Sequence, residues 1–469
     1  MSIDQARSAA RVWQDEIAKH DLHVSKKIEH ALFAGQARLL EAIVNDTNQP
    51  LQDALSAEFF PVIDAIAYYR RHAKRWRKSK KASTPLLLQP ASSYIHYLPY
   101  GVVLIIGPYN FPFQLTMLPA IVALAAGNAV IIKPSERSQH VPKVLQALLP
   151  QFGLPEHLLT ILEGDGTMAT SLIDEKPDKI FFTGSERIGR KVAVKAAELG
   201  IPCDLELSGG TSMIVFADCH LERAIHAALW GSFFHAGQVC VSVERIFVEQ
   251  TILYKFADQL FEQMHTLTPY AWDRLPDGDL GSLLLVADRT RIEEKLHFAK
   301  QHGAIILQAQ ITQDDELFYP PTLILDVEGT LIEEENEWFG PVVVVSPFQT
   351  VDDVIQRVNQ RRFGLNASVF HRDHHYARRL LEALHVGNGA VNDVIVNIGN
   401  ARLPFGGVKA SGYGRYKGKD GFYAFLQTQA MMVKNDRKRH QINWFPYSHR
   451  RVIALQKALS WIYQKRGMQ

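Results

Sequence analysis

Three residues that lie far apart in the sequence have side chains suited to chemistry at a carbonyl carbon. Cys240 comes just after a small, turn-prone Ala-Gly-Gln segment, and at a loop tip or helix start the backbone N–H groups would favour its thiolate. Glu206 stands between leucines and precedes a Gly-Gly pair, so partial burial would raise its pKa and make it a usable general base. Asn110 lies in a loop stiffened by two prolines and offers the amide donor that an oxyanion site requires.

Each of these residues also has a simpler explanation when it is considered alone. A lone cysteine is usually a small buried hydrophobic residue, and a carboxylate at a strand end is usually a surface charge. A Pro-Asn sequence commonly forms a tight turn. The chemical interpretation therefore depends on whether the fold brings the three side chains to one place.

Two other segments have the form of turns that meet a nucleotide. An apolar run ends at Thr183-Gly184-Ser185, and Gly189 follows in the next expected helix, so the backbone could approach a phosphate at the helix N-terminus. The glycine spacing is G-x-x-x-x-G rather than G-x-G-x-x-G, which alone indicates only a tight turn. A second apolar run leads into Lys133 and Glu136, where a solvated strand end is the simpler alternative.

Short apolar strands alternate with helices through the middle of the chain. The predicted strands cover residues 102–106, 129–132, 157–162 and 179–182, and the predicted helices cover 113–126 and begin at Ser138 and Glu186. This alternation is typical of a parallel sheet with right-handed crossovers. Ligands of such sheets bind at the carboxyl ends of the strands, where the residues above are found.

The flanking regions predict further elements. Residues 1–80 have the apolar spacing of helices, and residues 83–99 predict a hairpin. A second α/β segment follows over residues 209–400, with strands at 213–216, 245–248, 304–307, 342–345, 367–370 and 390–391. Four glycines within residues 403–415 predict a tight loop.

Composition excludes several classes of protein. The chain has 469 residues, too many for one hydrophobic core, and 47% hydrophobic with 21% charged residues excludes a disordered or collagen-like chain. The formal charge of +2 provides no field for nucleic acid. Three widely spaced cysteines without a CxxC predict no metal site and no disulfide framework. With no secretion signal at the N-terminus, we expect a cytoplasmic protein.

The C-terminal tail is the one strongly basic part of the chain. From Lys434 onward it has nine cations and one anion, so it carries +8 and the body carries −6. Residues 450–466 predict a helix with one apolar face. Such a helix either docks on its own subunit or a partner, or makes weak contact with an anionic membrane surface.

Taken together and in this order, the motifs resemble the aldehyde dehydrogenase superfamily from about residue 98 to 434. Residues 337–341 (EWFGP) and 404–415 (PFGGVKASGYGR) are similar to two more signatures of that family. A short N-terminus and Trp444-Phe445-Pro446-Tyr447 resemble its class-three, dimeric branch.

The resemblance implies a fold and a domain organisation. We expect a Rossmann-like NAD(P)-binding domain over residues 1–82 and 100–208 and a second α/β catalytic domain over 209–400. A small β oligomerisation arm would comprise the bridging segments 83–99 and 401–435, and 436–469 would form the basic tail. A homodimer is therefore expected.

The resemblance also implies the roles of individual residues. Cys240 would attack the aldehyde to give a thiohemiacetal, with the oxyanion held by the Asn110 amide and the Cys240 backbone N–H. Hydride transfer to the nicotinamide would leave a thioester, and Glu206 would activate the water that hydrolyses it. The cofactor would be NAD, with NADP as an alternative, held by Lys133, Glu136, Gly184, Ser185, Ile188, Gly189, Glu337 and Phe339.

Several residues depart from the family pattern. Tyr109 replaces a tryptophan, and Ser208-Gly209-Gly210 stands where Gly-Gly-Lys is usual. His235 replaces an asparagine, and either an imidazolium there lowers the thiol pKa or a neutral ring only packs on the loop. The changes at 208–210 and 235 keep open a catalytically impaired member with a binding role. An acyl-transferring or reductive relative is a separate alternative, against which Glu206 argues. By resemblance, Phe113, Leu115 and Leu118 line the entrance, which favours medium-chain aliphatic or aromatic aldehydes.

Overall fold

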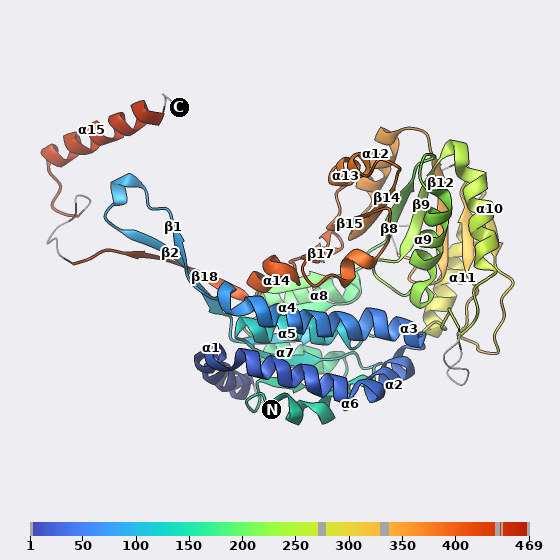
Figure 1. Ribbon diagram of the computed structural model, residues 1–469, viewed down its shortest axis with the longest axis horizontal. Helices are drawn as coiled ribbons and strands as arrows, with labels where there is room; N and C mark the ends of the chain where they lie inside the picture. Colours follow the sequence, from blue (N-terminus) through green and yellow to red (C-terminus); the bar gives the residue numbers. More distant parts are fainter. Residues whose placement is uncertain (1–2, 271–277, 329–336, 437–440, 442–443, 467–469) are drawn as a thin grey trace. The chain divides into compact units, whose positions relative to one another are not determined.

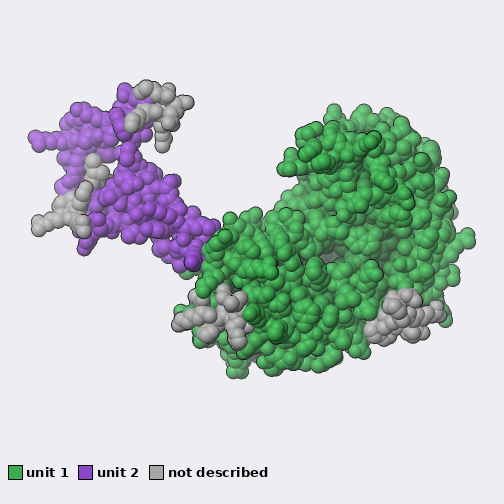
Figure 2. All heavy atoms as spheres, in the orientation of Figure 1, with its two compact units in different colours: residues 1–77, 98–427 green, residues 78–97, 428–469 purple. Residues whose placement is uncertain are grey.

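The computed structural model describes residues 3–270, 278–328, 337–436, 441 and 444–466. The chain divides into two compact units, one of residues 1–77 and 98–427 and one of residues 78–97 and 428–469 (Figure 2). Among the described residues, the larger unit contains a six-stranded sheet, a seven-stranded sheet and a two-stranded sheet of β13 (Phe363–Gly364) and β16 (Val408–Lys409). The smaller unit contains most of a three-stranded sheet (Figure 1).

Helices occupy the N-terminal region, as predicted. They are α1 (Ile3–Ala34), α2 (Gln36–Thr47), α3 (Leu51–Asp53), the π-helical turn η1 (Ala54–Phe59) and α4 (Phe60–Trp76). Helices α1 and α4 pack on each other, and α1 also covers strands of the first sheet.

The first sheet has the strand order β17-β7-β6-β3-β4-β5. Its strands are β3 (Val102–Ile106), β4 (Ala129–Lys133), β5 (Leu159–Ile161), β6 (Lys179–Thr183), β7 (Cys203–Glu206) and β17 (Gly412–Tyr413). All neighbours are parallel except β17, which pairs with β7 in the antiparallel sense. The connecting helices are α5 (Gln114–Ala126), α6 (Val141–Leu148), α7 (Gly166–Asp174) and α8 (Glu186–Glu198). This is the predicted parallel sheet with helical crossovers.

The second sheet has the order β10-β11-β12-β9-β8-β14-β15 and is parallel except between β10 and β11. Its strands are β8 (Thr211–Val215), β9 (Val243–Glu249), β10 (Ile305–Gln308), β11 (Thr322–Leu325), β12 (Val342–Phe348), β14 (Asn366–Phe370) and β15 (Asn388–Val391). Helices α9 (Leu221–Phe233), α10 (Leu253–Met264), α11 (Val286–Gln301), α12 (Val351–Gln360) and α13 (His374–Glu382) pack on it (Figure 1). Strand β11 had not been predicted.

The smaller unit contains a three-stranded sheet of order β1-β2-β18, formed by β1 (Lys80–Ala82), β2 (Ser92–Pro99) and β18 (Leu426–Val433). The second strand of the hairpin predicted over 83–99 is present as β2, but Leu86–Leu88 forms a 3-10 helix rather than the first strand. The antiparallel partner of β2 is β1, which lies before the predicted range. The tail forms α15 (His449–Arg466), whereas Arg437, Lys438 and Arg439 lie outside the described residues. None of the helices in the described ranges is long and apolar enough to cross a bilayer.

One helix begins later than predicted, for a physical reason. Helix α6 starts at Val141 rather than near Ser138. The carboxylate of Asp46, from α2, accepts the backbone N–H groups of Gln139, His140 and Val141. A side chain distant in sequence therefore caps this helix in place of a local Ser or Thr.

Candidate active site

Glu206 lies at the carboxyl end of β7, between the ends of two neighbouring strands. Thr183 of β6 is opposite it on one side and Gly412 of β17 on the other. A Cβ at Gly412 would come within 2.0 Å of the Leu205 carbonyl oxygen, and its φ is +108°. Only glycine meets both conditions, so the glycine-rich 403–415 segment can pair closely with the strand that carries Glu206.

Cys240 follows a sharply bent segment after α9. His235 and Ala236 both have a φ of 51°, and Gly237 has a φ of +70°. Three successive residues with left-handed φ reverse the chain direction at the end of the helix. A Cβ at Gly237 would lie 2.0 Å from the Gly340 carbonyl oxygen, so the bend is packed directly against the segment that precedes β12.

Cys240 and Glu206 line the same cavity, which has a volume of about 660 Å³. Thr183, at the end of β6, also contributes to it and connects the cavity to the β6–α8 turn. Most of the remaining wall is apolar, with Phe111, Leu115, Trp230, Phe234, Val239, Leu365, Ile395, Val396 and Ile398 among its residues. Of the three predicted entrance residues, Leu115 lines the cavity, whereas Phe113 and Leu118 do not.

The segment after Glu206 directly touches the loop of residues 234–240, called the nucleophile loop because it ends at Cys240, the predicted nucleophile. A Cβ at Gly209 would lie 1.5 Å from the carbonyl oxygen of Cys240. The Gly209 N–H donates to the Glu337 carboxylate over 3.0 Å. The unusual Ser208-Gly209-Gly210 segment therefore connects Glu206, which precedes it, to Cys240 and Glu337 through the backbone of Gly209.

Burial determines the protonation of Glu206. Its pKa is raised well above the ordinary value, chiefly because burial disfavours the carboxylate. Arg415 and Lys417 oppose this effect, and Asp204 reinforces it. The backbone N–H of Gly407 opposes it as well, and the buried carboxyl group can receive a proton.

Burial also raises the pKa of the Cys240 thiol, and the carboxylates of Glu337 and Glu206 raise it further. The backbone N–H of Cys240 and the Lys417 ammonium act in the opposite direction. The resting group is therefore a thiol, and thiolate formation needs both a proton acceptor and a positive charge nearby.

Asn110 lies behind the nucleophile loop rather than in the cavity wall. Its side-chain amide donates to the Gln238 carbonyl oxygen over 2.9 Å, and one amide hydrogen remains for another acceptor. The Asn110 carbonyl oxygen is 3.0 Å from Nε2 of His235. Burial lowers the pKa of His235 to about 4, so the ring is neutral and donates from Nε2. This geometry agrees with the packing interpretation of His235.

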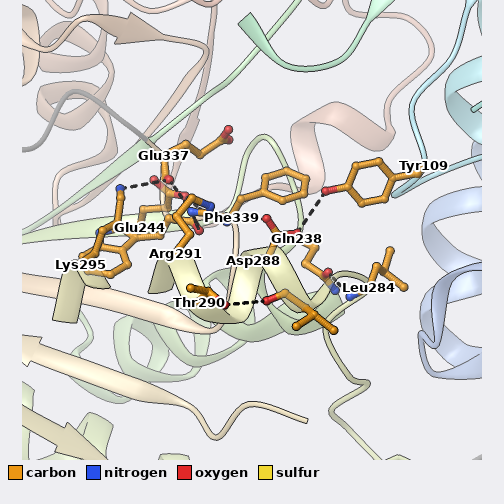
Figure 3. Close-up of polar contacts among 12 residues, drawn as sticks. Tyr109, Gln238, Glu244, Leu284, Asp288, Thr290, Arg291, Lys295, Glu337 and Phe339 are labelled. Atoms are coloured by element: carbon orange, nitrogen blue, oxygen red, sulfur yellow. Dashed lines mark hydrogen bonds and ion pairs between the residues drawn. The ribbon is translucent and has the colours of Figure 1, made fainter. Parts of the chain in front are cut away.

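Gln238 fixes this loop through its side chain (Figure 3). Its Oε1 accepts the Leu284 N–H over 2.8 Å, and its Nε2 donates to the Ser282 carbonyl over 3.2 Å. The buried amide thus fastens the chain just before Cys240 to the segment that precedes α11. A fixed loop is what a positioned nucleophile requires.

The β6–α8 turn has the form of a phosphate site. Ser185 caps α8 by accepting the Ile188 N–H, and the helix begins at Glu186. Cβ atoms at Gly184 and Gly189 would lie 2.8 Å from the Phe182 ring and 2.4 Å from Leu207, respectively. These glycines let the helix start pack closely on the strands. The N–H groups of Gly184, Ile188 and Gly189 donate to the carbonyl oxygens of Glu206 and Ser185, so the anion-binding character of this turn rests on the N-terminus of α8. The residues present therefore fit a dinucleotide.

Lys133 and Glu136 form an ion pair of 3.1 Å at the end of β4. The lysine side chain is 4% exposed and the glutamate 55%. The ion pair neutralises the cation that would attract a 2′-phosphate, while the carboxylate remains accessible to ribose hydroxyls.

Glu337 and Phe339 belong to a polar cluster beside the nucleophile loop (Figure 3). The Phe339 N–H donates to Glu244 over 2.9 Å. Burial and the neighbouring Glu244 carboxylate raise the pKa of Glu337.

Tyr109 extends the same cluster toward α11 (Figure 3). Its hydroxyl lies 3.4 Å from Asp288, which also forms a 3.0 Å ion pair with Arg291. The Tyr109 ring meets the Phe339 ring edge-on at 6.3 Å. Tyr109, which stands where the family has tryptophan, thus gives this wall of the site a hydroxyl anchored on α11.

The sequence did not point to Lys417, which lines the cavity, or to the influence of Arg415 on Glu206. Arg415 closes a predicted family signature and Lys417 follows two positions later, in a stretch that has the charges of a surface turn. Across the described ranges, no group of His, Cys, Asp and Glu side chains is suited to a metal ion. The arrangement combines a thiol, a buried carboxyl group and a phosphate turn around one apolar cavity.

Comparison with known proteins identifies related chains. The model of the aldehyde dehydrogenase family matches residues 1–431. The chain is 36% identical to 4,4'-diapolycopene aldehyde oxidase from Methylomonas sp over 474 residues, covering 99% of this chain and 87% of that protein. It is 31% identical to the dimeric NADP-preferring aldehyde dehydrogenase of Mus musculus over 414 residues, covering 85% and 89%.

A solved structure shows the same architecture. A double mutant of betaine aldehyde dehydrogenase from Staphylococcus aureus, in complex with NAD+, matches with a TM-score of 0.87 and 28% identity, covering 95% of this chain and 90% of that one. These findings confirm the predicted family resemblance and the α/β fold class, and they support NAD(P) as the cofactor.

Proposed function

The chain belongs to the aldehyde dehydrogenase family, and on this basis we propose that it oxidises aldehydes to carboxylic acids through a covalent intermediate on Cys240. The observation that carries the proposal is that Cys240 and Glu206 line one apolar cavity. The β6–α8 turn reaches the same cavity through Thr183.

In the first step the Cys240 sulfur attacks the carbonyl carbon of the aldehyde. Glu206, ionised, takes the thiol proton, and the thiohemiacetal oxygen becomes the oxyanion. The backbone N–H of Cys240 is one donor that stabilises it. The free amide hydrogen of Asn110, which does not line the cavity in this structure, would be the second donor once the side chain turns toward the oxyanion. The neutral His235 ring supports Asn110 from behind through its 3.0 Å contact with the Asn110 carbonyl.

NAD(P) supplies the acceptor for the hydride that leaves the substrate carbon. Gly184, Ser185, Ile188 and Gly189 would hold its pyrophosphate, Lys133 and Glu136 its adenosine ribose, and Glu337 with Phe339 its nicotinamide ribose. The Lys133–Glu136 ion pair favours NAD over NADP.

After the hydride has left, Glu206 releases the proton it took from the thiol to solvent, and in the last step its carboxylate acts on water. Its buried carboxylate removes a proton as the water attacks the Cys240 thioester, which releases the acid and restores the thiol. The apolar wall keeps other water away from the thioester.

The test is NADH or NADPH formation followed by absorbance with a panel of aldehydes. Cys240→Ser should lose activity with every substrate. Wild-type protein that binds NAD and aldehyde without producing NADH would support the alternative of a binding role. Reaction of acyl-CoA with NADH would support the acyl-transferring or reductive alternative, against which the presence of Glu206 argues.

The apolar wall favours medium-chain aliphatic or aromatic aldehydes. The name of the Methylomonas relative adds long polyene aldehydes to the panel. A preference for short polar aldehydes would contradict this substrate assignment but would leave the reaction itself in place.

A homodimer is the proposed assembly, in line with the dimeric Mus musculus relative. In the three-stranded sheet of the smaller unit, β18 is an edge strand with mostly exposed side chains. Light scattering of the full chain should give twice the monomer mass.

The domain boundaries and the cytoplasmic location stay predictions. Vesicle co-sedimentation with and without the residues after Lys434 tests the membrane contact of the tail.

A further inference from the structure

Lys417 is a buried cation in the active-site cavity with no part in the steps described above. The residue is 1% exposed and lines the cavity together with Cys240 and Glu206. Its φ of 66° lies in the left-handed region, which favours glycine. It stands immediately before α14 (Gly418–Ala424). A long charged side chain is thus held in an unfavourable place and conformation, which is common where a residue acts in the chemistry of a site.

The contacts of the ammonium leave its charge uncompensated. Nζ donates to the Ile398 carbonyl oxygen. It also lies 4.9 Å from the Phe405 ring centre and 5.4 Å from that of Tyr416. Among the residues that the structure describes, no carboxylate forms an ion pair with it. A carbonyl and two ring faces hold a cation in place without neutralising it.

The groups that respond to this charge are those that carry the reaction. Glu206 on β7 and Cys240 on the nucleophile loop both raise the pKa of Lys417. Lys417 in turn lowers the pKa of both groups. Other charged or titratable groups lie around these two residues. Arg415 lowers the pKa of Glu206 and Asp204 raises it, while Glu337 raises the pKa of Cys240. The Tyr416 phenol is also in this group.

We propose that Lys417 is a positioning residue for the reaction: its ammonium stabilises the charged forms of Glu206 and Cys240, which the apolar cavity would otherwise keep protonated. This role rests on the proposed function of those two residues. Burial lowers the pKa of Lys417 to about 7, against the opposing effect of Glu206 and Cys240, so the amine can take up a proton under physiological conditions.

The proton balance is simple. A neutral Lys417 amine with a protonated Glu206 has the same net charge as the ammonium with the carboxylate, so one proton moves and none is gained or lost. The carboxylate then takes the thiol proton of Cys240 during attack. The ammonium remains in the same cavity as the developing thiolate, and its charge lowers the cost of forming the thiolate in a buried site.

The test measures alkylation of Cys240 by iodoacetamide between pH 6 and 9.5, read at that residue by mass spectrometry. Lys417→Met removes the charge and keeps the length of the side chain, and Lys417→Arg keeps a charge that does not titrate. We expect alkylation at pH 7.5 to fall about tenfold in the Met variant, equivalent to about one pKa unit. The Arg variant should stay at or above the wild-type rate. Alkylation of Cys219, outside the cavity, is the internal control.

A merely structural role predicts a different result. If Lys417 only fastens the Ile398 segment, the Met variant should lower the thermal midpoint while the pH profile of Cys240 alkylation superimposes on the wild type, and this outcome overturns the proposal. If the Met variant does not fold, the Arg variant decides: faster alkylation than wild type above pH 8 supports the proposal, and an identical profile overturns it. Alkylation needs neither aldehyde nor turnover, so this result is independent of whether the proposed oxidation occurs.

Discussion

Replacement of Gly209 with alanine should slow aldehyde oxidation by about a hundredfold, because a methyl group there displaces the nucleophile. The new Cβ would lie 1.5 Å from the Cys240 carbonyl oxygen, whereas real Cβ atoms stay at least 3.0 Å from such an atom. The two backbones must therefore separate by about 1.5 Å. A displacement of about 1 Å at reacting groups commonly costs about a hundredfold in rate, or about 2.7 kcal/mol of transition-state stabilisation.

The assay compares kcat/KM for one good aldehyde in wild type, Gly209→Ala and Gly166→Ala. Gly166 is a matched control, since a Cβ there meets nothing within 4 Å and its φ is not left-handed. We expect the control to keep wild-type activity. Binding of NAD to both variants, measured by fluorescence, shows that the β6–α8 turn is intact.

Wild-type kcat/KM in Gly209→Ala would refute the argument, because it would mean that the two segments separate without moving the sulfur. Because the Gly209 N–H also donates to Glu337, the variants are compared at saturating NAD, and full recovery of the rate under that condition would also contradict the argument.

Three further predictions concern single side chains. Glu206→Gln should lower NADH formation by at least about a hundredfold without a rapid burst, because the variant lacks the base that takes the thiol proton and activates the water. The raised pKa of Glu206 should also place the acid limb of the wild-type pH–rate profile above the ordinary carboxyl range, and a limb unchanged in the variant would exclude it as the base. Glu136→Gln should raise the ratio of kcat/KM for NADP over NAD by about two- to fivefold by freeing Lys133, and an unchanged ratio would contradict that ion pair's role. Burial lowers the pKa of His235 in the folded protein to about 4. As the pH falls from 6.5 to 4 the unfolded chain therefore binds a proton first, and the free energy of unfolding decreases by up to about 3 kcal/mol. Urea titrations of His235→Asn should lack this part of the acid sensitivity, and the acid limb of its pH–rate profile should match the wild type.

The first sheet was predictable because its central strands are buried on both faces. Strands β3 and β4 are buried at every position, so they appear in the sequence as continuous apolar runs bounded by turn residues. Other features depend on distant contacts. The start of α6 is set by Asp46 of α2, and the apolar run at Leu86–Leu88 forms a single 3-10 turn. A run that short does not distinguish a strand from a turn.

The residues of the site also differ in how far the sequence alone could predict them. The neighbours of Cys240 and Glu206 in the sequence left a simpler explanation open for each, and the resemblance to the family assigned their roles. The structure places both residues in one cavity. Lys417 had no such signal, because the sequence Arg-Tyr-Lys-Gly-Lys-Asp around it has the polarity of an exposed turn. Its burial follows from the close packing of residues 403–417 against β7. For His235, the sequence left a charged and a neutral ring open, and burial decides for the neutral one.

The pairing of β17 with β7 sets an order of events during synthesis. Gly412 lies opposite Glu206, more than two hundred positions earlier in the chain. Until the segment that contains β17 leaves the ribosome, β7 is an open edge of a half-made sheet, and such edges invite association with other nascent chains. Lys417, which lines the cavity with Cys240, emerges only a few residues later. The cavity around Cys240 is therefore completed only when about nine tenths of the polypeptide exists.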